Sequence, residues 1–222
     1  STLGASLLAV ANHFILFFLG IETLSISLYI LIAFQRSKDS SIEAGIKYLI
    51  LASVSSAFLL FGMALIYTAF GTMQFNGIVS AINNDGQLSP LVISGFGLMM
   101  VGIGFKLALV PFHMWTPDVY EGAPTSITAF MATVVKAAGF SAFIRVFFSA
   151  LPAFRPDWTS IMWIICVATM TLGNIAAISQ TNIKLMLAYS SIAHAGYILV
   201  AFVAGNDLGT SGILFYLMAY AF

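Results

Sequence analysis

Charged side chains are scarce in this chain. Eight basic and eight acidic residues make up only 7% of its 222 residues, whereas a soluble domain carries roughly 25%. So few charges cannot cover the surface of a water-soluble fold of this size. Because acids and bases balance, there is no basic face of the kind that binds nucleic acid. The composition therefore excludes a soluble domain and predicts no nucleic-acid partner.

Cysteine is nearly absent too. A single cysteine, Cys166, can neither close a disulfide within the chain nor ligate a cysteine-held metal cluster, and it is expected to be a small packing residue. The chain also lacks H-E-x-x-H, G-x-S-x-G and P-loop motifs, and the G-x-G pairs of GFGLMMVGIGFK do not follow a strand. The sequence therefore predicts no metal or cofactor bound by this chain.

Apolar residues, in contrast, are abundant, at 60% of the chain with a mean hydropathy of +1.02. A bilayer core of ~30 Å needs ~20 apolar residues per helix. We therefore expect an all-α, polytopic transmembrane helical bundle, one domain over residues 1–222 with about seven spans. The expected helices cover residues 1–11 (the tail of one span), 13–34, 41–70, 90 onward, 125–148, 158–178, 184–204 and 208 onward.

The sequence also predicts two polar connections between helices. Residues 71–89 contain a turn signal, Asn83-Asn84-Asp85-Gly86, and residues 151–157 hold two prolines.

The chain begins without methionine and stops inside the apolar run GILFYLMAYAF, so we expect it to be an internal piece of a longer protein. One side of the predicted bundle carries four basic residues, Arg36, Lys38, Lys47 and Lys184, and the other side carries Arg155. By the positive-inside rule, we expect the first side to be cytoplasmic or matrix-like.

A broken helix is predicted over residues 104–125, GFKLALVPFHMWTPDVYEGAPT. An apolar helix carrying Lys106 meets Pro111 and Pro117, which disrupt the backbone ladder. In a membrane such breaks are tolerated where protein or trapped water satisfies the backbone, and they occur at ion or substrate sites. We therefore expect the helix to be interrupted between Lys106 and Pro117.

Three of the predicted spans carry an ionisable residue far from at least one end: Glu22, Lys106 and Lys136. The lysines could snorkel to the headgroups, whereas Glu22 is too short and needs a partner or a proton. Ionisable groups inside a membrane are expensive and mark ion or proton pathways. We expect Glu22 to lie near a buried Lys106, and Lys136 to be the deepest lysine and the proton-storing one.

Polar neighbours support this interpretation. Ser25 and Tyr29 follow Glu22 at i+3 and i+7, which places them on one stripe. His194 lies well inside its helix, with Ser190 and Ser191 on the same helix surface and Lys184 at the start of that helix. A lone buried histidine such as His194 is more often structural than a proton relay, and His13, near a span end where its ring can reach water, is expected to be structural. We nevertheless predict a lateral polar line of Lys106, Lys136 and His194 near mid-membrane.

The run GFKLALVPFHMWTPDVYEGAPTSITAFMATVVKAAGF resembles the antiporter-like membrane subunits of respiratory complex I, the NADH:quinone oxidoreductase. Further similarity lies in FLGIETLSISLYIL and SQTNIKLMLAYSSIAHAGY, and the resemblance covers essentially the whole chain. Thr116 distinguishes one subunit type, because sister subunits and multi-subunit sodium/proton antiporters usually carry leucine there.

The resemblance implies a fold of two inverted repeats, each with a broken helix and a buried lysine or its equivalent. Residues 1–150 would hold most of the first repeat and residues 151–222 the start of the second. It implies proton transfer by Glu22, Lys106, Lys136, Lys184 and His194, coupled to quinone reduction elsewhere. NADH, FMN, iron–sulfur clusters and quinone would bind to partner subunits, in a bacterial inner membrane.

The sequence is also compatible with two other functions. The chain could be a subunit of a multi-subunit cation/proton antiporter or of a membrane hydrogenase, which share the same fold. It could also be a passive structural membrane subunit whose charges serve assembly.

Overall fold

The computed structural model describes residues 1–85 and 89–222, and within these residues the chain folds into helices without a β-strand. Only an isolated bridge pairs His13 with Gln74. The predicted all-α fold is therefore confirmed. The helices are α1 (Thr2–Val10), α2 (Phe14–Ile32), α3 (Asp39–Phe70), α4 (Phe75–Asp85), α5 (Pro90–Lys106), α6 (Trp115–Gly122), α7 (Thr125–Phe130), a π-helical turn (Met131–Val135), α8 (Lys136–Ile144), a second π-helical turn (Arg145–Ala150), a 3-10 turn (Pro152–Phe154), α9 (Arg155–Ile178), α10 (Ile183–Ala204) and α11 (Asp207–Ala221).

Among the described residues, five helices are long and apolar enough to cross a membrane. The shorter apolar helix α5 ends at Lys106, and the chain becomes helical again at Trp115. The predicted interruption is thus confirmed, with one refinement: Pro117 lies inside the first turn of α6, where a missing backbone N–H is tolerated. The five long helices are Phe14–Ile32, Asp39–Phe70, Thr125–Ala150, Arg155–Ile178 and Ile183–Ala204.

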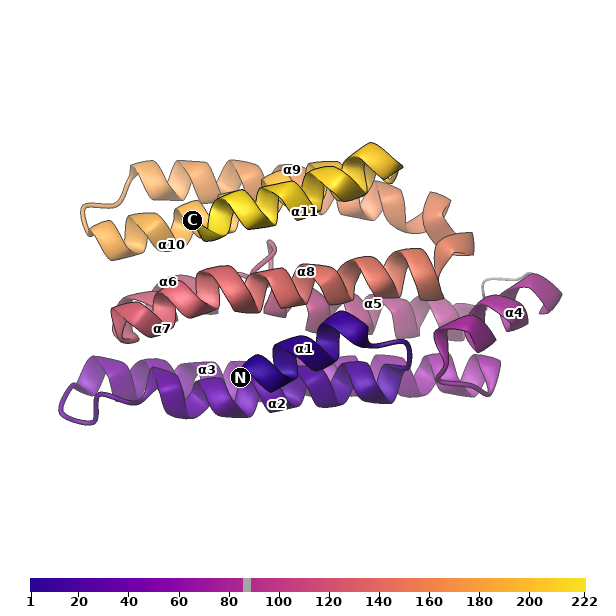
Figure 1. Ribbon diagram of the computed structural model, residues 1–222, viewed down its shortest axis with the longest axis horizontal. Coiled ribbons are helices and arrows are strands. Elements are labelled where there is room, and N and C mark those ends of the chain that lie inside the picture. Colours follow the sequence, from indigo (N-terminus) through magenta and orange to yellow (C-terminus); the bar gives the residue numbers. More distant parts are fainter. Residues whose placement is uncertain (86–88) are drawn as a thin grey trace.

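The helices lie side by side along the long axis of the molecule (Figure 1). α2 and α3 form one edge, α9, α10 and α11 form the opposite edge, and the helix from α7 to α8 runs between them. The connections before α3 and before α10 lie at the same end of the bundle, as the grouping of Arg36, Lys38 and Lys184 predicts. The start of α9, with Arg155, lies at the other end.

Two expected connections are wrong in part. The stretch 71–89 contains the helix α4, because Phe75, Ile78 and Ile82 recur at i, i+3 and i+7 and bury an apolar face. Of the turn signal at 83–86, Gly86 lies outside the described residues. The stretch 151–157 is shorter than predicted, because α9 begins at Arg155 with a proline in its first turn.

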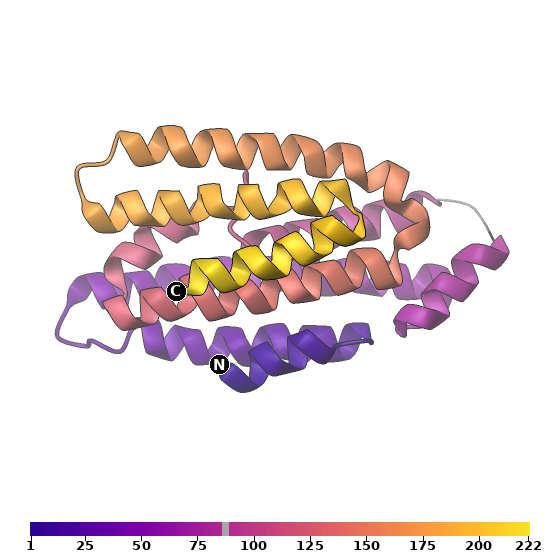
Figure 2. The same cartoon turned by 45° about the horizontal axis from the view of Figure 1, so that its top comes forward.

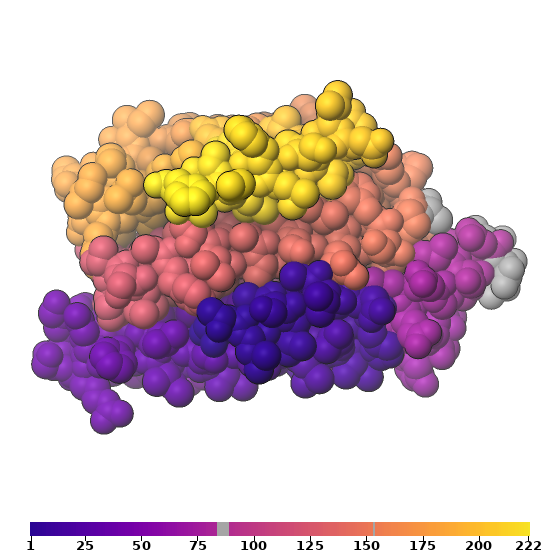
Figure 3. Space-filling view, viewed as in Figure 1, coloured from indigo at the N-terminus to yellow at the C-terminus, as the bar shows by residue number. Residues whose placement is uncertain are grey.

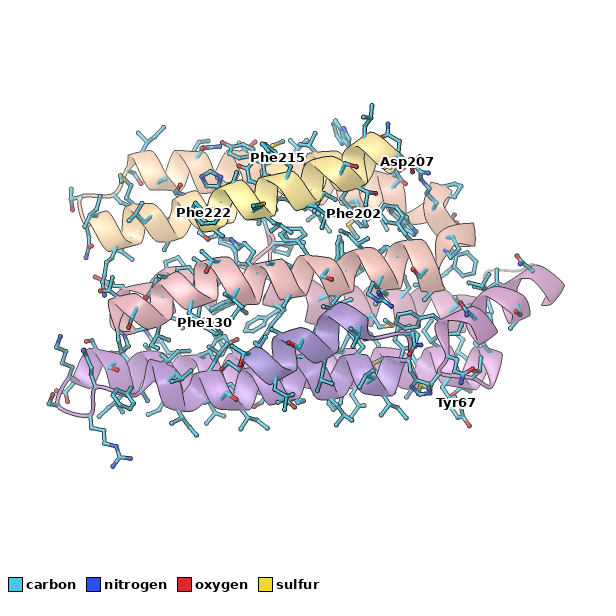
Figure 4. The ribbon with its side chains drawn as sticks, viewed as in Figure 1. Tyr67, Phe130, Phe202, Asp207, Phe215 and Phe222 are labelled. Carbon is cyan, nitrogen blue, oxygen red and sulfur yellow. The ribbon has the colours of Figure 1, made fainter. Side chains whose placement is uncertain are left out.

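An aromatic cluster joins the central helix to α9 and α10. The ring of Phe202 lies 4.3 Å from the ring centre of Phe143 and 5.3 Å from that of Trp158. Phe147 packs edge-on against both Phe202 and Trp158. Figure 4 shows Phe202 directed into the bundle, whereas Tyr67 points away from it. This cluster fixes the position of the helix that carries Lys136.

The pair formed by α3 and α5 is packed closely enough to need glycine. A Cβ atom on Gly102 would lie 2.6 Å from Cβ of Leu59, whereas a Cβ atom on Gly97 of the same helix would meet no atom within 4 Å. Small residues at such contacts let two helices approach closely in a membrane.

We predict that Gly102→Ala lowers stability by about 1–3 kcal/mol, because overpacking must push the helices apart. Gly97→Ala is the matched control, and it should be neutral or stabilising by roughly 0.5–1 kcal/mol, because alanine favours helix. The apparent Tm of the purified protein in detergent measures both. Equal Tm values for the two variants would contradict the close contact.

Candidate functional site

Lys106 is the last residue of α5 and is buried between α2 and α3, with 7% of its surface exposed. Its Nζ donates hydrogen bonds to Ser25 Oγ at 2.8 Å and to Tyr48 Oη at 2.9 Å. Nζ also lies 5.4 Å from the ring centre of Tyr48, within the range of a cation–π contact. The predicted burial of Lys106 is confirmed.

Glu22 lies one turn before Ser25 on α2, and its carboxylate accepts a hydrogen bond from Ser56 of α3. Within the described residues, the ion pairs join Lys47 to carboxylates, so Glu22 and Lys106 are not directly paired. Ser25, Ser56 and Lys106 instead line one cavity of about 10 Å³, roughly the room that one water needs. Glu22 and Lys106 are therefore each bonded to a serine, and both serines line the same small cavity.

The break after Lys106 is stabilised by other helices. The backbone N–H of Val110 donates to Thr169 Oγ1 of α9 at 3.1 Å, and the indole N–H of Trp115 donates to the carbonyl of Phe105 at 2.9 Å. Figure 2 shows the segment between α5 and α6 reaching toward α9. Helix breaks in membranes need such partners for their backbone, and here α9 supplies one.

Lys136 begins α8 directly after the π-helical turn and is 3% exposed. Its Nζ donates to the carbonyl and hydroxyl oxygens of Ser191 on α10, at 2.5 and 2.6 Å. The ring centre of Tyr220 of α11 lies 5.8 Å away. π-helical turns inside α-helices are frequent at functional sites, and this one directly precedes a buried cation.

His194 lies one turn after Ser191 on α10. Its Nδ1 shares a hydrogen bond of 2.5 Å with Tyr216 Oη, and the Tyr220 ring centre lies 4.8 Å from its own. Figure 3 shows α11, which carries both tyrosines, lying over this face of the molecule. The ammonium of Lys136, on α8, thus contacts α10 at Ser191, about one helical turn from His194.

Lys106 lies apart from that pair. Between them come Trp115, whose ring centre is 4.9 Å from that of Tyr48, and Tyr120, 6.0 Å beyond Trp115. Tyr120 then lines a cavity together with Ser191 and His194. The lateral line is therefore interrupted by aromatic rings, and its depth in a membrane stays a prediction.

Lys184 lies at the start of α10 and donates two hydrogen bonds of 3.1 Å, to the carbonyls of Glu121 and Ala123. Lysine in this position satisfies the last carbonyls of a helix and interacts favourably with its dipole. The side-chain amide of Asn182 donates a hydrogen bond of 2.6 Å from Nδ2 to Oε1 of the Glu121 carboxylate. His13 is the N-cap of α2 and accepts from the N–H of Ile15, a structural role as expected.

Four tyrosines of the site, Tyr48, Tyr120, Tyr216 and Tyr220, were not predicted from the sequence. Tyr216 and Tyr220 carry a signal, since their i, i+4 spacing places them on one face of α11. Tyr48 and Tyr120 carry none, because only packing between distant helices brings them to Lys106 and Ser191. Within the described residues, no group of three or more His, Cys, Asp or Glu side chains could hold a metal ion.

Residues 11–222 match the family described as NADH:quinone oxidoreductase/Mrp antiporter, transmembrane region. The chain is 52% identical to NADH-quinone oxidoreductase subunit N of Trichlorobacter lovleyi, over the whole chain and 46% of that protein. It therefore spans about half the length of the curated relatives that it matches.

Two solved structures share the fold. A chain of respiratory complex I from Thermus thermophilus with bound aureothin is 40% identical, with a TM-score of 0.81 over 99% of this chain and 47% of that one. A chain of the membrane-bound sulfane sulfur reductase, an archaeal respiratory membrane complex, is 30% identical, with a TM-score of 0.89 over 99% of this chain and 45% of that one.

We predict that Tyr48 and Lys106 are energetically coupled. Tyr48→Phe keeps the ring but removes the acceptor of a charged donor, which should cost about 1.5–3 kcal/mol. In the Lys106→Met background the same change should cost much less, because no ammonium then loses a partner. A double-mutant cycle of stability in detergent measures the coupling. A coupling indistinguishable from zero would argue against this hydrogen bond.

Proposed function

Because the chain belongs to the NADH:quinone oxidoreductase/Mrp antiporter family of membrane proteins, we propose that it translocates protons as part of a subunit N of NADH:quinone oxidoreductase, respiratory complex I. The relatives that carry this name are bacterial, so the site of action is the bacterial inner membrane. Its partners are the other membrane subunits of the complex and the surrounding lipid.

One observation carries the proposal: two buried lysines are held by neutral oxygen atoms alone. Lys106 donates to two hydroxyls and Lys136 to the two oxygens of Ser191, and within the described residues neither forms an ion pair. Burying an unpaired charge is expensive. Without a carboxylate partner, neither lysine has to break an ion pair to release its proton, as a proton carrier requires.

The roles follow from the contacts. Glu22 and Lys106 exchange protons through the serines between them, and Lys136 stores the proton that His194 passes on along α10. Lys184 acts at the start of the same helix. The redox chemistry belongs to partner subunits, which bind NADH, FMN, iron–sulfur clusters and quinone.

The curated relatives favour this assignment over an antiporter or membrane hydrogenase subunit. The curated relatives named as NADH-quinone oxidoreductase subunit N match over nearly the whole chain. A passive structural role is disfavoured by the cost of two buried, unpaired lysines.

We predict that Lys136→Met assembles and supports electron transfer at a reduced rate but pumps few protons. Methionine keeps the length and apolar packing of the side chain without a titrating group. Lys136→Arg should fail as well, because guanidinium keeps its proton in this pH range. Proton uptake by vesicles that contain the assembled complex measures both variants during NADH oxidation.

The matched control is Lys38→Met, which removes a lysine from an exposed connection and should pump at the parent rate. If Lys136→Met and Lys136→Arg both pumped at the parent rate in assembled complex, the proposed role of Lys136 would be wrong.

A further inference from the structure

The helix α11 packs against α10 and against the π-helical turn that directly precedes Lys136. Figure 2 shows α11, in yellow, crossing beside both of these segments. Its residues Tyr216 and Tyr220 are four positions apart and therefore share one face of the helix. Their ring centres lie 5.9 and 4.8 Å from the ring centre of His194. α11 thus brings two phenol side chains to the histidine of α10.

The hydroxyl group of Tyr216 is the polar partner of the His194 ring. Its Oη lies 2.5 Å from Nδ1 of the imidazole, and within the part of the chain that the structure describes His194 makes no other side-chain hydrogen bond. His194 also lines a cavity of about 360 Å³, as does Ser191, which holds the ammonium of Lys136. Tyr216 therefore occupies Nδ1 and leaves Nε2 as the nitrogen that is free to exchange a proton.

The ring of Tyr220 lies against both bases. Its centre is 4.8 Å from the ring centre of His194 and 5.8 Å from Nζ of Lys136, and an aromatic ring attracts a cation within about 6 Å. Two of the three N–H groups of the Lys136 ammonium are given to Ser191, which leaves the third for the ring. A positive charge therefore meets the same aromatic ring whether it resides on Lys136 or on His194.

We propose that Tyr216 is a positioning residue for proton exchange between Lys136 and His194. Its hydroxyl oxygen accepts a hydrogen bond from Nδ1–H of His194, which fixes the imidazole ring and makes Nε2 the nitrogen that gains and loses the proton. This inference rests on the proposed function and deepens it, because it assigns a role to a helix, α11, that carries none of the ionisable residues named in that function.

The exchange moves one proton and no electrons. An N–H bond of the Lys136 ammonium breaks, the proton passes through the Ser191 hydroxyl and water in the shared cavity, and an N–H bond forms at Nε2 of His194. Lys136 is then a neutral amine and His194 an imidazolium, whose Nδ1–H still donates to Tyr216. Release of the Nε2 proton to the next carrier restores the neutral histidine with its Nδ1–H in place.

The Tyr216 hydroxyl matters most while His194 carries the charge. Both nitrogens of an imidazolium are donors, and a donor that loses its acceptor in an apolar site is destabilised, more so when it is charged. Without the hydroxyl of Tyr216, Nδ1–H faces aromatic carbon. The charged histidine then becomes harder to form, and the ring is free to turn Nε2 away from the cavity.

Tyr197 provides a matched control within the same cluster. Its ring centre lies 5.5 Å from that of His194, similar to the 5.9 Å of Tyr216. Its hydroxyl, however, shares hydrogen bonds of 2.7 and 3.0 Å with the side-chain amide of Asn174 on α9. Tyr197→Phe thus removes a phenol hydroxyl and its hydrogen bonds beside His194 but leaves Nδ1 untouched. If these hydroxyls served packing alone, Tyr216→Phe and Tyr197→Phe would have similar effects.

Proton uptake by vesicles that contain the complex, measured during NADH oxidation and normalised to the amount of assembled complex, compares the two variants. Tyr216→Phe should slow uptake roughly tenfold, because one hydrogen bond to a charged group shifts an equilibrium by a decade or more. Tyr197→Phe should match the parent. The solvent deuterium isotope effect on uptake should rise in Tyr216→Phe alone, because proton transfer at His194 then limits the rate. Tyr216→Met and Tyr197→Met, which also lack the hydroxyl, replace the pair if Tyr216→Phe does not assemble.

Equal uptake rates in Tyr216→Phe and Tyr197→Phe would overturn the positioning role. Slower uptake in Tyr216→Phe without a larger isotope effect would overturn it too, because it would show that the hydroxyl serves packing. Parent-rate pumping by Lys136→Met would instead refute the proposed function, whatever the tyrosine variants do. If Lys136→Met fails to pump while the two tyrosine variants behave alike, only the role of Tyr216 is wrong, so the two failures are distinguishable.

Discussion

The cost of keeping two ammonium groups out of water governs this structure. Lys106 and Lys136 are both buried, and each is held by neutral oxygen atoms instead of a carboxylate. Truncating a partner of such a group leaves an unsatisfied charge, whereas a full ion pair would fix the proton in place. Hydroxyl and carbonyl partners are a compromise, because they stabilise the ammonium while allowing the amine to form.

The broken helix depends on the same constraint. α5 ends at Lys106, so that the ammonium lies at a C-terminal helix end, where cations are favoured. The chain beyond it needs partners for its own backbone, and Thr169 of α9 supplies one to Val110. A local break in one helix is thereby tied to a helix some sixty residues later in the chain. A movement of α9 would therefore strain or break the hydrogen bond to Val110, just beyond the end of α5.

Much of this arrangement could be predicted from the sequence, because apolar run length, proline and isolated charge are local signals. They located the five long apolar helices, the break after Lys106 and the burial of that lysine. They also placed Ser191 beside His194. The helix α4 was missed although its apolar spacing is visible. Tyr48 and Thr169 could not be found, because their roles arise only when distant helices pack, and the π-helical turn before Lys136 has no sequence signal.

The aromatic residues between the lysines set the condition for any exchange between them. Trp115 contacts Tyr48 on one side and Tyr120 on the other. Its single N–H is already given to the carbonyl of Phe105, and indole has no acceptor with which to relay a proton. As it lies in this structure, Trp115 therefore does not relay a proton between Lys106 and Lys136. Trp115 begins α6 immediately after the break, so a change in the broken segment would alter the contacts of Trp115 with both tyrosines.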